Sequence, residues 1–198
     1  MTQPLAAPLP SAAAPKPGCS ACGRASEASF TEPLAHVLTE IAALLRALTD
    51  EQYARKPVGV LPGSIGGHVR HGIDHVRALL GAVATGTLDY DRRERGTPIE
   101  VNRRAALEAL DHTIGALRTL DAAAGDRAIT VRALLSAHAP PVEVRSTLGR
   151  ELVYVLTHTI HHNATISAMA ATLGVAVPSS FGYAPSTTAF LLKSSCVR

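Results

Sequence analysis

The amino-acid sequence predicts an all-α protein whose simplest architecture is an antiparallel four-helix bundle. Hydrophobic residues make up 46% of its 198 residues but aromatic residues only 4%, so the core must be built mainly from Leu, Ala, Val and Ile. Such a core favours packed helices over a β-sandwich or a barrel. Four stretches also repeat apolar residues at spacings of three and four, which is the period of an amphipathic helix. Helices of this kind joined by connections of different length are typical of a bundle.

The first 28 residues are predicted to form a disordered tail, so the folded domain is assigned to residues 29–198. The tail is rich in Pro, Ala, Ser and Gly, and such a segment cannot bury enough surface to offset the entropy of ordering it. It holds Cys19 and Cys22 in a CxxC motif, which can be half of a zinc site or a redox pair. No second CxxC follows, so two incidental thiols are the simpler interpretation, and Cys196 is interpreted in the same way.

Charge and composition favour a cytoplasmic protein that binds neither nucleic acid nor membranes. The formal charge of +3 is scattered along the chain rather than gathered into a basic stripe interleaved with aromatic residues. The amino terminus lacks the basic region and the unbroken apolar run of a signal peptide, and no run of about 18 apolar residues predicts a membrane span. Three cysteines cannot all pair within the chain, which fits a reducing compartment.

The first two helices are predicted over residues 31–48 and 64–85. Thr31 is expected to cap the first helix, and Leu, Val and Ile then form one apolar stripe along it. The second helix begins after a serine and ends before a glycine. Its first turn contains Gly66 and Gly67, which weaken the helix locally but allow another backbone to approach closely.

The third helix is predicted to open at Thr97 with a capping box, because Glu100 follows the cap after three residues. Two short β-prone runs around a Pro-Pro pair, within residues 129–146, predict either a small hairpin or an extended connection. The fourth helix is predicted over residues 146–173, with Gly174 as its carboxyl-terminal cap.

The strongest chemical signal is a concentration of histidines. Six of the nine lie in two predicted helices: His68, His71 and His75 in the second, and His158, His161 and His162 in the fourth. At about 100° per residue, the first three project from one side of their helix. His158 and His162 are one turn apart, the spacing by which a helix offers two nitrogens to one metal.

Two ligands from one helix and one from the other would hold a divalent metal such as Zn, Ni, Fe or Mn and leave one position open. The alternative is a set of ordinary hydrogen-bonded or surface histidines.

The segments "SIGGHVRHGIDHVRALL" and "RELVYVLTHTIHHNATI" resemble the DinB-like superfamily of metal-binding four-helix bundles, over about residues 30–175. The resemblance implies a divalent metal held by one histidine of the second helix and an HxxxH pair of the fourth. His71, His158 and His162 match these positions, and His68 is the chief rival for the place on the second helix. Where many relatives continue with Arg-Gly-Gln, this chain has Asn-Ala-Thr.

The remaining members of the two clusters are candidates for alternative ligands or for contacts with the ligands. His75 and His161 belong to this group, because six histidines cannot all bind one ion. Asp74 lies three residues from His71 and is a candidate acceptor for its second ring N–H, the interaction that orients many metal ligands. Glu151 lies two turns before His158, which is too far along the helix for it to bind the same metal.

A charged segment, residues 89–98, connects the second and third helices. The simplest interpretation is a solvated loop. The alternative is that Arg92, Arg93 or Arg95 binds an acidic substrate, because a guanidinium group pairs with carboxylates through two parallel hydrogen bonds. Tyr183, in the tail after the fourth helix, is a weaker candidate for a hydroxyl that lines the site.

These observations lead to three hypotheses of function. The first is a metal-dependent transferase or hydrolase, in which the ion activates water or a low-molecular-weight thiol, and the resemblance implies thiol chemistry. Its partner is a small-molecule substrate, for example a thiol. The second is a non-catalytic module that binds a metal or another ligand and can form a homodimer through an apolar face. The third is a structural bundle without a metal.

Overall fold

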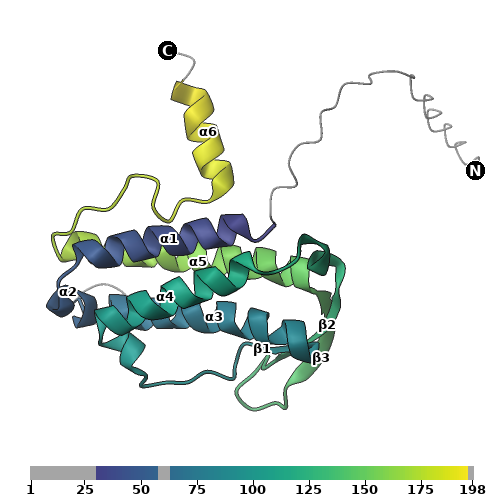
Figure 1. The fold of residues 1–198 in the computed structure, drawn as a ribbon. Coiled ribbons are helices and arrows are strands. Elements are labelled where there is room, and N and C mark those ends of the chain that lie inside the picture. The colour runs from purple at the N-terminus through teal and green to yellow at the C-terminus, as the bar shows by residue number, and fades with distance from the viewer. Residues whose placement is uncertain (1–29, 58–62, 196–198) are drawn as a thin grey trace, which may run out of the picture.

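The structure is a computed structural model that describes residues 30–57 and 63–195 (Figure 1). The described chain is mostly helical and carries one small sheet. Its helices are α1 (Glu32–Ala47), α2 (Asp50–Ala54), α3 (Ile65–Thr85), α4 (Arg103–Arg118), α5 (Leu148–Thr172) and α6 (Pro185–Ser195). Its strands are β1 (Thr87–Asp89), β2 (Ala128–Ala133) and β3 (Val142–Thr147), and two 3₁₀ turns are η1 (Pro98–Glu100) and η2 (Ala122–Asp126). Cys19, Cys22 and Cys196 lie outside the described residues.

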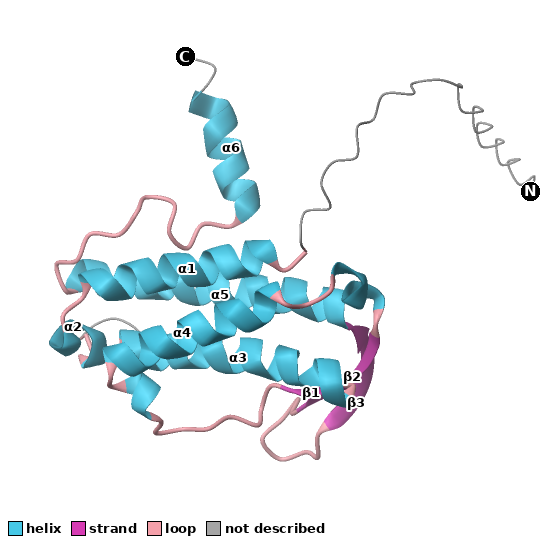
Figure 2. Cartoon of the chain, in the orientation of Figure 1, coloured by secondary structure: helices cyan, strands magenta, loops and turns pink. Residues whose placement is uncertain are grey.

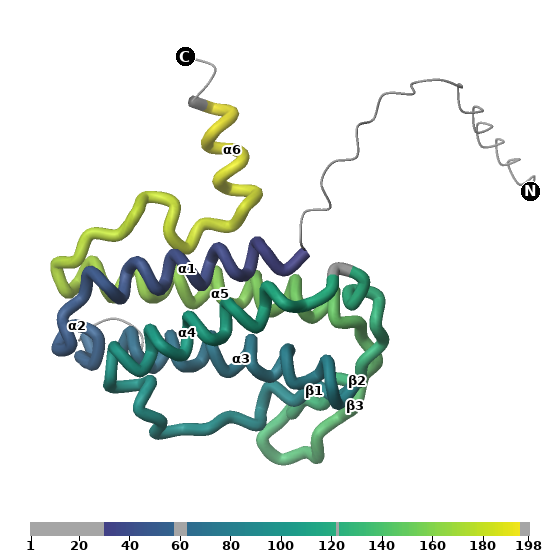
Figure 3. Tube along the Cα trace, in the orientation of Figure 1, coloured from purple at the N-terminus to yellow at the C-terminus, as the bar shows by residue number. Residues whose placement is uncertain are grey.

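The four long helices, α1, α3, α4 and α5, lie side by side (Figures 1 and 3). Helix α3 runs toward the sheet because β1 follows it, whereas α5 runs away from the sheet because it begins directly after β3, so the two are antiparallel. The core between the helices is aliphatic and includes Leu38, Leu45, Ile73, Leu110, Leu117 and Ile166, all buried. All of these except Ile166, which lies on α5, belong to the apolar stripes predicted for the first three helices, so helical periodicity selected most of the buried faces; Val101, also placed in a stripe, is exposed.

Local signals define the ends of α3 as expected, whereas α5 begins at Leu148, two residues after the predicted start, because Ser146 and Thr147 end β3. Ser64 caps α3 by accepting a hydrogen bond from the backbone N–H of Gly67, and Gly86 ends it in the left-handed conformation with φ +69°. Thr147 caps α5 in the same manner. The expectation for α1 is wrong in one detail, since the Thr31 side chain makes no capping hydrogen bond to the helix.

The predicted start of the third helix is also wrong. Residues 98–100 form the 3₁₀ turn η1, and the α-helix begins only at Arg103, where the Asn102 side chain accepts a hydrogen bond from the backbone N–H of Ala105. Thr97 makes no capping hydrogen bond. The Glu100 carboxylate instead accepts from the backbone N–H of Gly96, at 3.0 Å, and pairs with Arg70 of α3, at 2.9 Å. A tertiary ion pair therefore replaces the capping box.

The sheet lies at one end of the long helices (Figure 2) and has the strand order β1-β2-β3. Strands β2 and β3 form the antiparallel hairpin that was one of the two expected forms of residues 129–146. Strand β1 was not predicted; it pairs with β2 in parallel, with Leu88 opposite Val131. Both of these side chains are buried, so the inner face of the sheet closes the end of the core. The all-α prediction is therefore right only for the helical part.

Two helices were not predicted from the sequence. Helix α2 is a single short turn with a capping box between Thr49 and Gln52. Helix α6 extends away from the long helices in Figure 1, and its Phe190 and Leu192 side chains are exposed. No helix in the described ranges is both long and apolar enough to cross a membrane.

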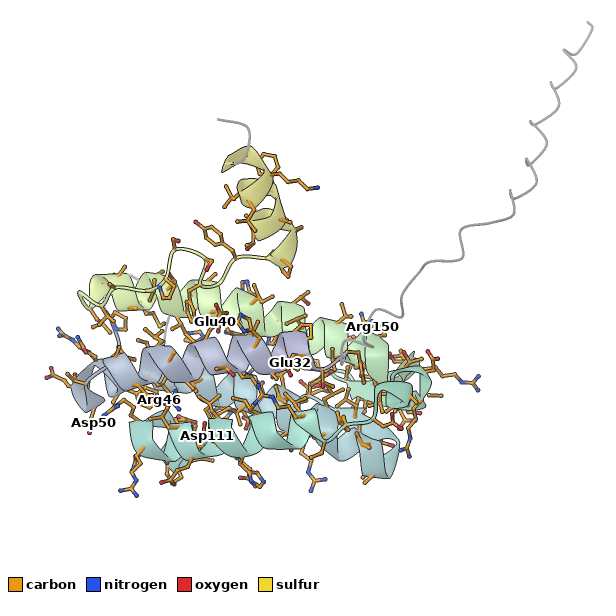
Figure 4. All side chains as sticks on the ribbon, turned by 45° about the horizontal axis from the view of Figure 1, so that its top comes forward. Glu32, Glu40, Arg46, Asp50, Asp111 and Arg150 are labelled. Atoms are coloured by element: carbon orange, nitrogen blue, oxygen red, sulfur yellow. The ribbon has the colours of Figure 1, made fainter. Side chains whose placement is uncertain are left out.

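Charged side chains of α1 and α4 include Glu32, Glu40, Arg46 and Asp111, which are labelled in Figure 4. Arg46 and Asp111 face each other, with 3.8 Å between a guanidinium nitrogen and a carboxylate oxygen. Because both side chains are more than half exposed, such a pair adds little to stability. The buried aliphatic residues, rather than ion pairs, hold α1 against α4.

Gly66 and Gly67 give a matched test of how α3 packs against η1. A Cβ at residue 66 would overlap the carbonyl oxygen of Glu100 and lie 2.8 Å from the ring of Tyr53, whereas one at residue 67 would meet only the Ser64 hydroxyl, at 3.6 Å. We expect Gly66→Ala to lower the free energy of unfolding by about 2–3 kcal/mol. Gly67→Ala should leave it unchanged or raise it by up to about 1 kcal/mol, because alanine favours helix. Urea unfolding of both variants checks this, and equal stabilities would contradict it.

Candidate metal centre

Four imidazole rings from two antiparallel helices meet between α3 and α5. The Nε2 atom of His158 lies 3.0 Å from Nε2 of His71 and 3.2 Å from Nε2 of His162. One ring nitrogen each of His71, His75 and His158 also lie within 4.8 Å of one another. The helical spacing explains the grouping, because residues three and four apart share a face. The structure thus brings together the three histidines predicted as ligands and adds His75, which was expected only as an alternative ligand or a neighbour.

His75 is held in one orientation by its own helix. Its Nδ1 atom lies 2.9 Å from the backbone carbonyl oxygen of His71 and therefore donates a hydrogen bond to it. This bond leaves the Nε2 lone pair free, which is the usual arrangement of a histidine that binds metal. The ring of Tyr90 stacks on His75 with a centroid distance of 5.0 Å and 16° between the ring planes.

His68, the rival for the ligand position on the second helix, lies on the far side of His162. The two Nδ1 atoms are 2.9 Å apart, so one of them donates to the other. If His162 carries its proton on Nδ1, its Nε2 lone pair points into the cluster and His68 is the acceptor that fixes this tautomer. From this position His68 orients the ring of His162 through a hydrogen bond and is less well placed to bind the metal itself. Its other nitrogen, Nε2, is buried and makes no hydrogen bond within the described residues.

Burial and mutual repulsion keep the cluster neutral. Burial, followed by the neighbouring imidazoles, lowers the pKa of His71 and of His162 to about 3 each and that of His158 to about 4. The pKa values of His68 and His75 are also lowered, mainly by burial. At neutral pH these rings are therefore uncharged, with one ring nitrogen of each unprotonated, which is the form that binds metal ions.

The neighbour of the outer nitrogen of His71 is an arginine rather than the expected aspartate. Nη1 of Arg93, from the loop at residues 90–97, lies 3.0 Å from Nδ1 of His71 and donates to it, so neutral His71 carries its ring proton on Nε2 in this arrangement. Metal binding at Nε2 of His71 would require this proton to leave Nε2 and the contact with Arg93 to change. Asp74 instead accepts from Nη1 of Arg70, one turn away, at 2.7 Å. The aspartate prefers arginine because a charge-assisted hydrogen bond is stronger than one to a neutral imidazole.

A buried carboxylate supports the aromatic side of the cluster. Glu151 accepts hydrogen bonds from the hydroxyl of Tyr90, at 2.9 Å, from the hydroxyl of Ser146, at 2.6 Å, and from Nη1 of Arg150, at 2.9 Å. Burial and this carboxylate raise the pKa of Tyr90 above its usual value. Tyr154 stacks on His158 with 13° between the ring planes. Glu151 thus lies away from the imidazoles, as expected, but it positions the tyrosine that stacks on one of them.

Several predicted residues lie apart from the cluster. His161, Arg92 and Arg95 are exposed, although the ring of His161 lies 5.5 Å from that of His162. Tyr183 contributes to a separate surface pocket. The sequence reasoning missed Tyr90 and Tyr154. Only the position of Tyr154, one turn before His158, offered a signal for either.

The donor set fits a divalent cation. Two nitrogens that bind one zinc ion at about 2.0–2.1 Å in a tetrahedral arrangement lie roughly 3.3 Å apart. The 3.0 and 3.2 Å separations around His158 are close to this value. Neutral imidazoles are suitable ligands for Zn, Ni and Fe. A cavity of about 390 Å³ opens beside the cluster and is lined by His68, His71, His162, Arg93 and Lys56, among others.

The fold and the cluster define a mostly helical protein with a candidate metal centre between two of its helices. The DinB superfamily model matches residues 34–166, and the chain belongs to the DinB superfamily. The resemblance seen in the two histidine-bearing segments is therefore confirmed.

Known proteins add two further similarities. The DinB-like protein YjoA of Bacillus subtilis shares the fold, with a TM-score of 0.54 at 17% identity over 77% of this chain and 97% of YjoA. FK506-binding protein 5 of Rhizopus delemar is 36% identical over 107 residues, which are 54% of this chain and 28% of the fungal protein. The chain thus spans little more than a quarter of that relative.

Proposed function

We propose that this protein binds a divalent metal through His71, His158 and His162 and uses it as a transferase or hydrolase acting on a small molecule. The observation that carries the proposal is the convergence of three Nε2 atoms, with separations of 3.0 and 3.2 Å around His158. The four long helices are assigned to the antiparallel four-helix bundle of this superfamily, and a cytoplasmic location is part of the proposal.

The surrounding residues have distinct parts in this site. His68 shares a hydrogen bond with His162 through their Nδ1 atoms, and Tyr90 stacks on His75, so both limit the movement of imidazoles in the cluster. Bound there, a divalent ion such as Zn, Ni, Fe or Mn would lower the pKa of a thiol or of water, so that either is a nucleophile at neutral pH. The cavity beside His71 and His162 gives a small molecule access to this position.

The alternative is a module that binds a metal or another ligand without turnover, alone or as a homodimer. Two observations favour it. His75 stands close enough to His71 and His158 to serve as a further ligand, and four protein ligands would leave a tetrahedral ion no open position. A segment similar to this chain also occurs within a much longer fungal protein, as a module would.

Elemental analysis of the full chain tests the proposal. We expect near-stoichiometric metal after reconstitution with Zn, Ni, Mn or Fe(II), because the neutral imidazoles are already close together. Assays of thiol transfer and of hydrolysis, with and without a chelator, then separate the enzyme from the module. Chelator-sensitive turnover supports the enzyme, and stoichiometric metal without turnover supports the module. Failure to retain any of the four metals would contradict the enzyme and the metal-binding form of the module.

A further inference from the structure

A second cavity, of about 570 Å³, lies between the carboxyl-terminal half of α3, the sheet and the loop at residues 90–97. Four arginines from three different segments line it: Arg77 of α3, Arg92 and Arg93 of the loop, and Arg132 of β2. None of the four makes an ion pair within residues 30–57 and 63–195. Unpaired guanidinium groups that converge on a cavity attract anions.

Three acidic residues, Asp74, Asp89 and Glu94, also line this cavity and offset part of the charge of its four arginines. Asp74 is already paired with Arg70, at 2.7 Å. One oxygen of Asp89 accepts the backbone N–H groups of Asp91 and Arg92, and the remaining acid, Glu94, is exposed. Four arginines against three acids leave the lining one positive charge in excess. Arg77, Arg92 and Arg132 are exposed, as Glu94 is, whereas Arg93 is half-buried.

Arg93 connects this cavity with the candidate metal centre. Its guanidinium group lines both cavities and donates to His71. Its Nε atom is buried and makes no hydrogen bond within the described residues. A buried donor without an acceptor is costly, and an oxyanion in either cavity could fill this place.

We propose that the arginine-lined cavity binds the oxyanion group, a carboxylate or a phosphate, of an acidic small-molecule substrate. Arg93 is the central contact, and Arg77, Arg92 and Arg132 supply further positive charge around the anion. The substrate would extend from this cavity past Arg93 toward the imidazoles of α3 and α5. Its role as substrate rests on the proposed function, but binding of the oxyanion itself does not require a metal.

Calorimetric or NMR titration of the metal-free full chain tests the inference, with succinate and inorganic phosphate as probes at constant ionic strength. We expect binding of at least one probe, and Arg93→Gln should weaken it at least about tenfold. The Arg93→Lys variant keeps the positive charge but loses the planar guanidinium group. Its affinity for the probe should therefore lie between those of the wild type and of Arg93→Gln. Arg104→Gln removes the same charge from an exposed position on α4, outside the cavity, and should change the affinity less than about twofold.

Each result has a definite meaning. Binding of phosphate alone indicates a phosphorylated substrate, binding of succinate alone indicates a carboxylic acid, and both support the site. The inference is wrong if neither probe binds, or if Arg104→Gln weakens binding as much as Arg93→Gln. Metal binding without oxyanion binding would leave the proposed function standing and overturn only this site. Oxyanion binding without metal binding would support this site and contradict the metal-dependent activity. Circular dichroism confirms that each variant is folded.

Discussion

Replacing both His158 and His162 with alanine is expected to lower the affinity for divalent metal at least about a thousandfold, because two of the converging nitrogens are lost. Both side chains come from α5, and the ring contacts of His71 and His75 across the cluster are lost with them. No single histidine of α3 can replace a pair one turn apart. Competition with a chromophoric chelator, for wild type and variant, measures the change.

The control for this variant removes the same number of imidazoles elsewhere. His36 of α1 and His112 of α4 are exposed and lie outside the cluster. The His36→Ala/His112→Ala variant should bind metal as the wild type does, within about threefold, because isolated surface histidines bind weakly. Similar losses in the two double variants would show that scattered imidazoles, rather than the centre between α3 and α5, account for the binding.

Acid is expected to destabilise the metal-free protein by at least about 2 kcal/mol between pH 7 and pH 5. The pKa values of His71 and His162 lie at about 3 and that of His158 at about 4 in the folded protein, against about 6.5 for an ordinary histidine. Between these values the unfolded chain binds more protons, so stability rises with pH. The contribution of these three neutral imidazoles to the free energy of unfolding is therefore complete above about pH 6.5 and is lost as the pH falls toward 3. Solvent around these half-buried rings reduces the effect below its ideal sum.

Urea unfolding of the chelator-treated protein at several pH values provides the measurement. A variant with glutamine at residues 158 and 162 keeps polar side chains there but cannot be protonated, so its stability should depend less steeply on pH. Equal free energies of unfolding at pH 7 and pH 5 for the wild type would show that the imidazoles are not held neutral by the fold.

The histidine cluster was predictable because it depends on helical periodicity. His158 and His162 share a face of any helix, and in the structure this face of α5 packs against α3. The fourth member, His75, lay on the predicted face of α3, but its orientation depends on a backbone carbonyl and on Tyr90. Side-chain orientation of this kind arises only after the elements have packed.

Some failures in prediction share a physical cause, since tertiary contacts outweighed local ones. Glu100 pairs with Arg70 instead of completing a capping box at Thr97, so the helix starts later. Asp74 also pairs with Arg70, and Arg93 takes the place beside His71. Glu100 and Arg93 found partners on α3 from other segments, which no spacing along the sequence reveals, whereas the Arg70–Asp74 pair has the i,i+4 spacing of one helix and was overlooked.

The parallel pairing of β1 with β2 has a consequence for the arginine loop. Only eight residues, 90–97, separate β1 from η1, and both ends are fixed, one by the sheet and the other by packing against α3 and α4. A short segment anchored at both ends has few conformations left to lose when a ligand arrives. The loop therefore holds Arg93 close to its binding position before an anion arrives. Little conformational entropy of the loop is lost on binding, so the affinity for the anion is higher than a freely moving loop would give.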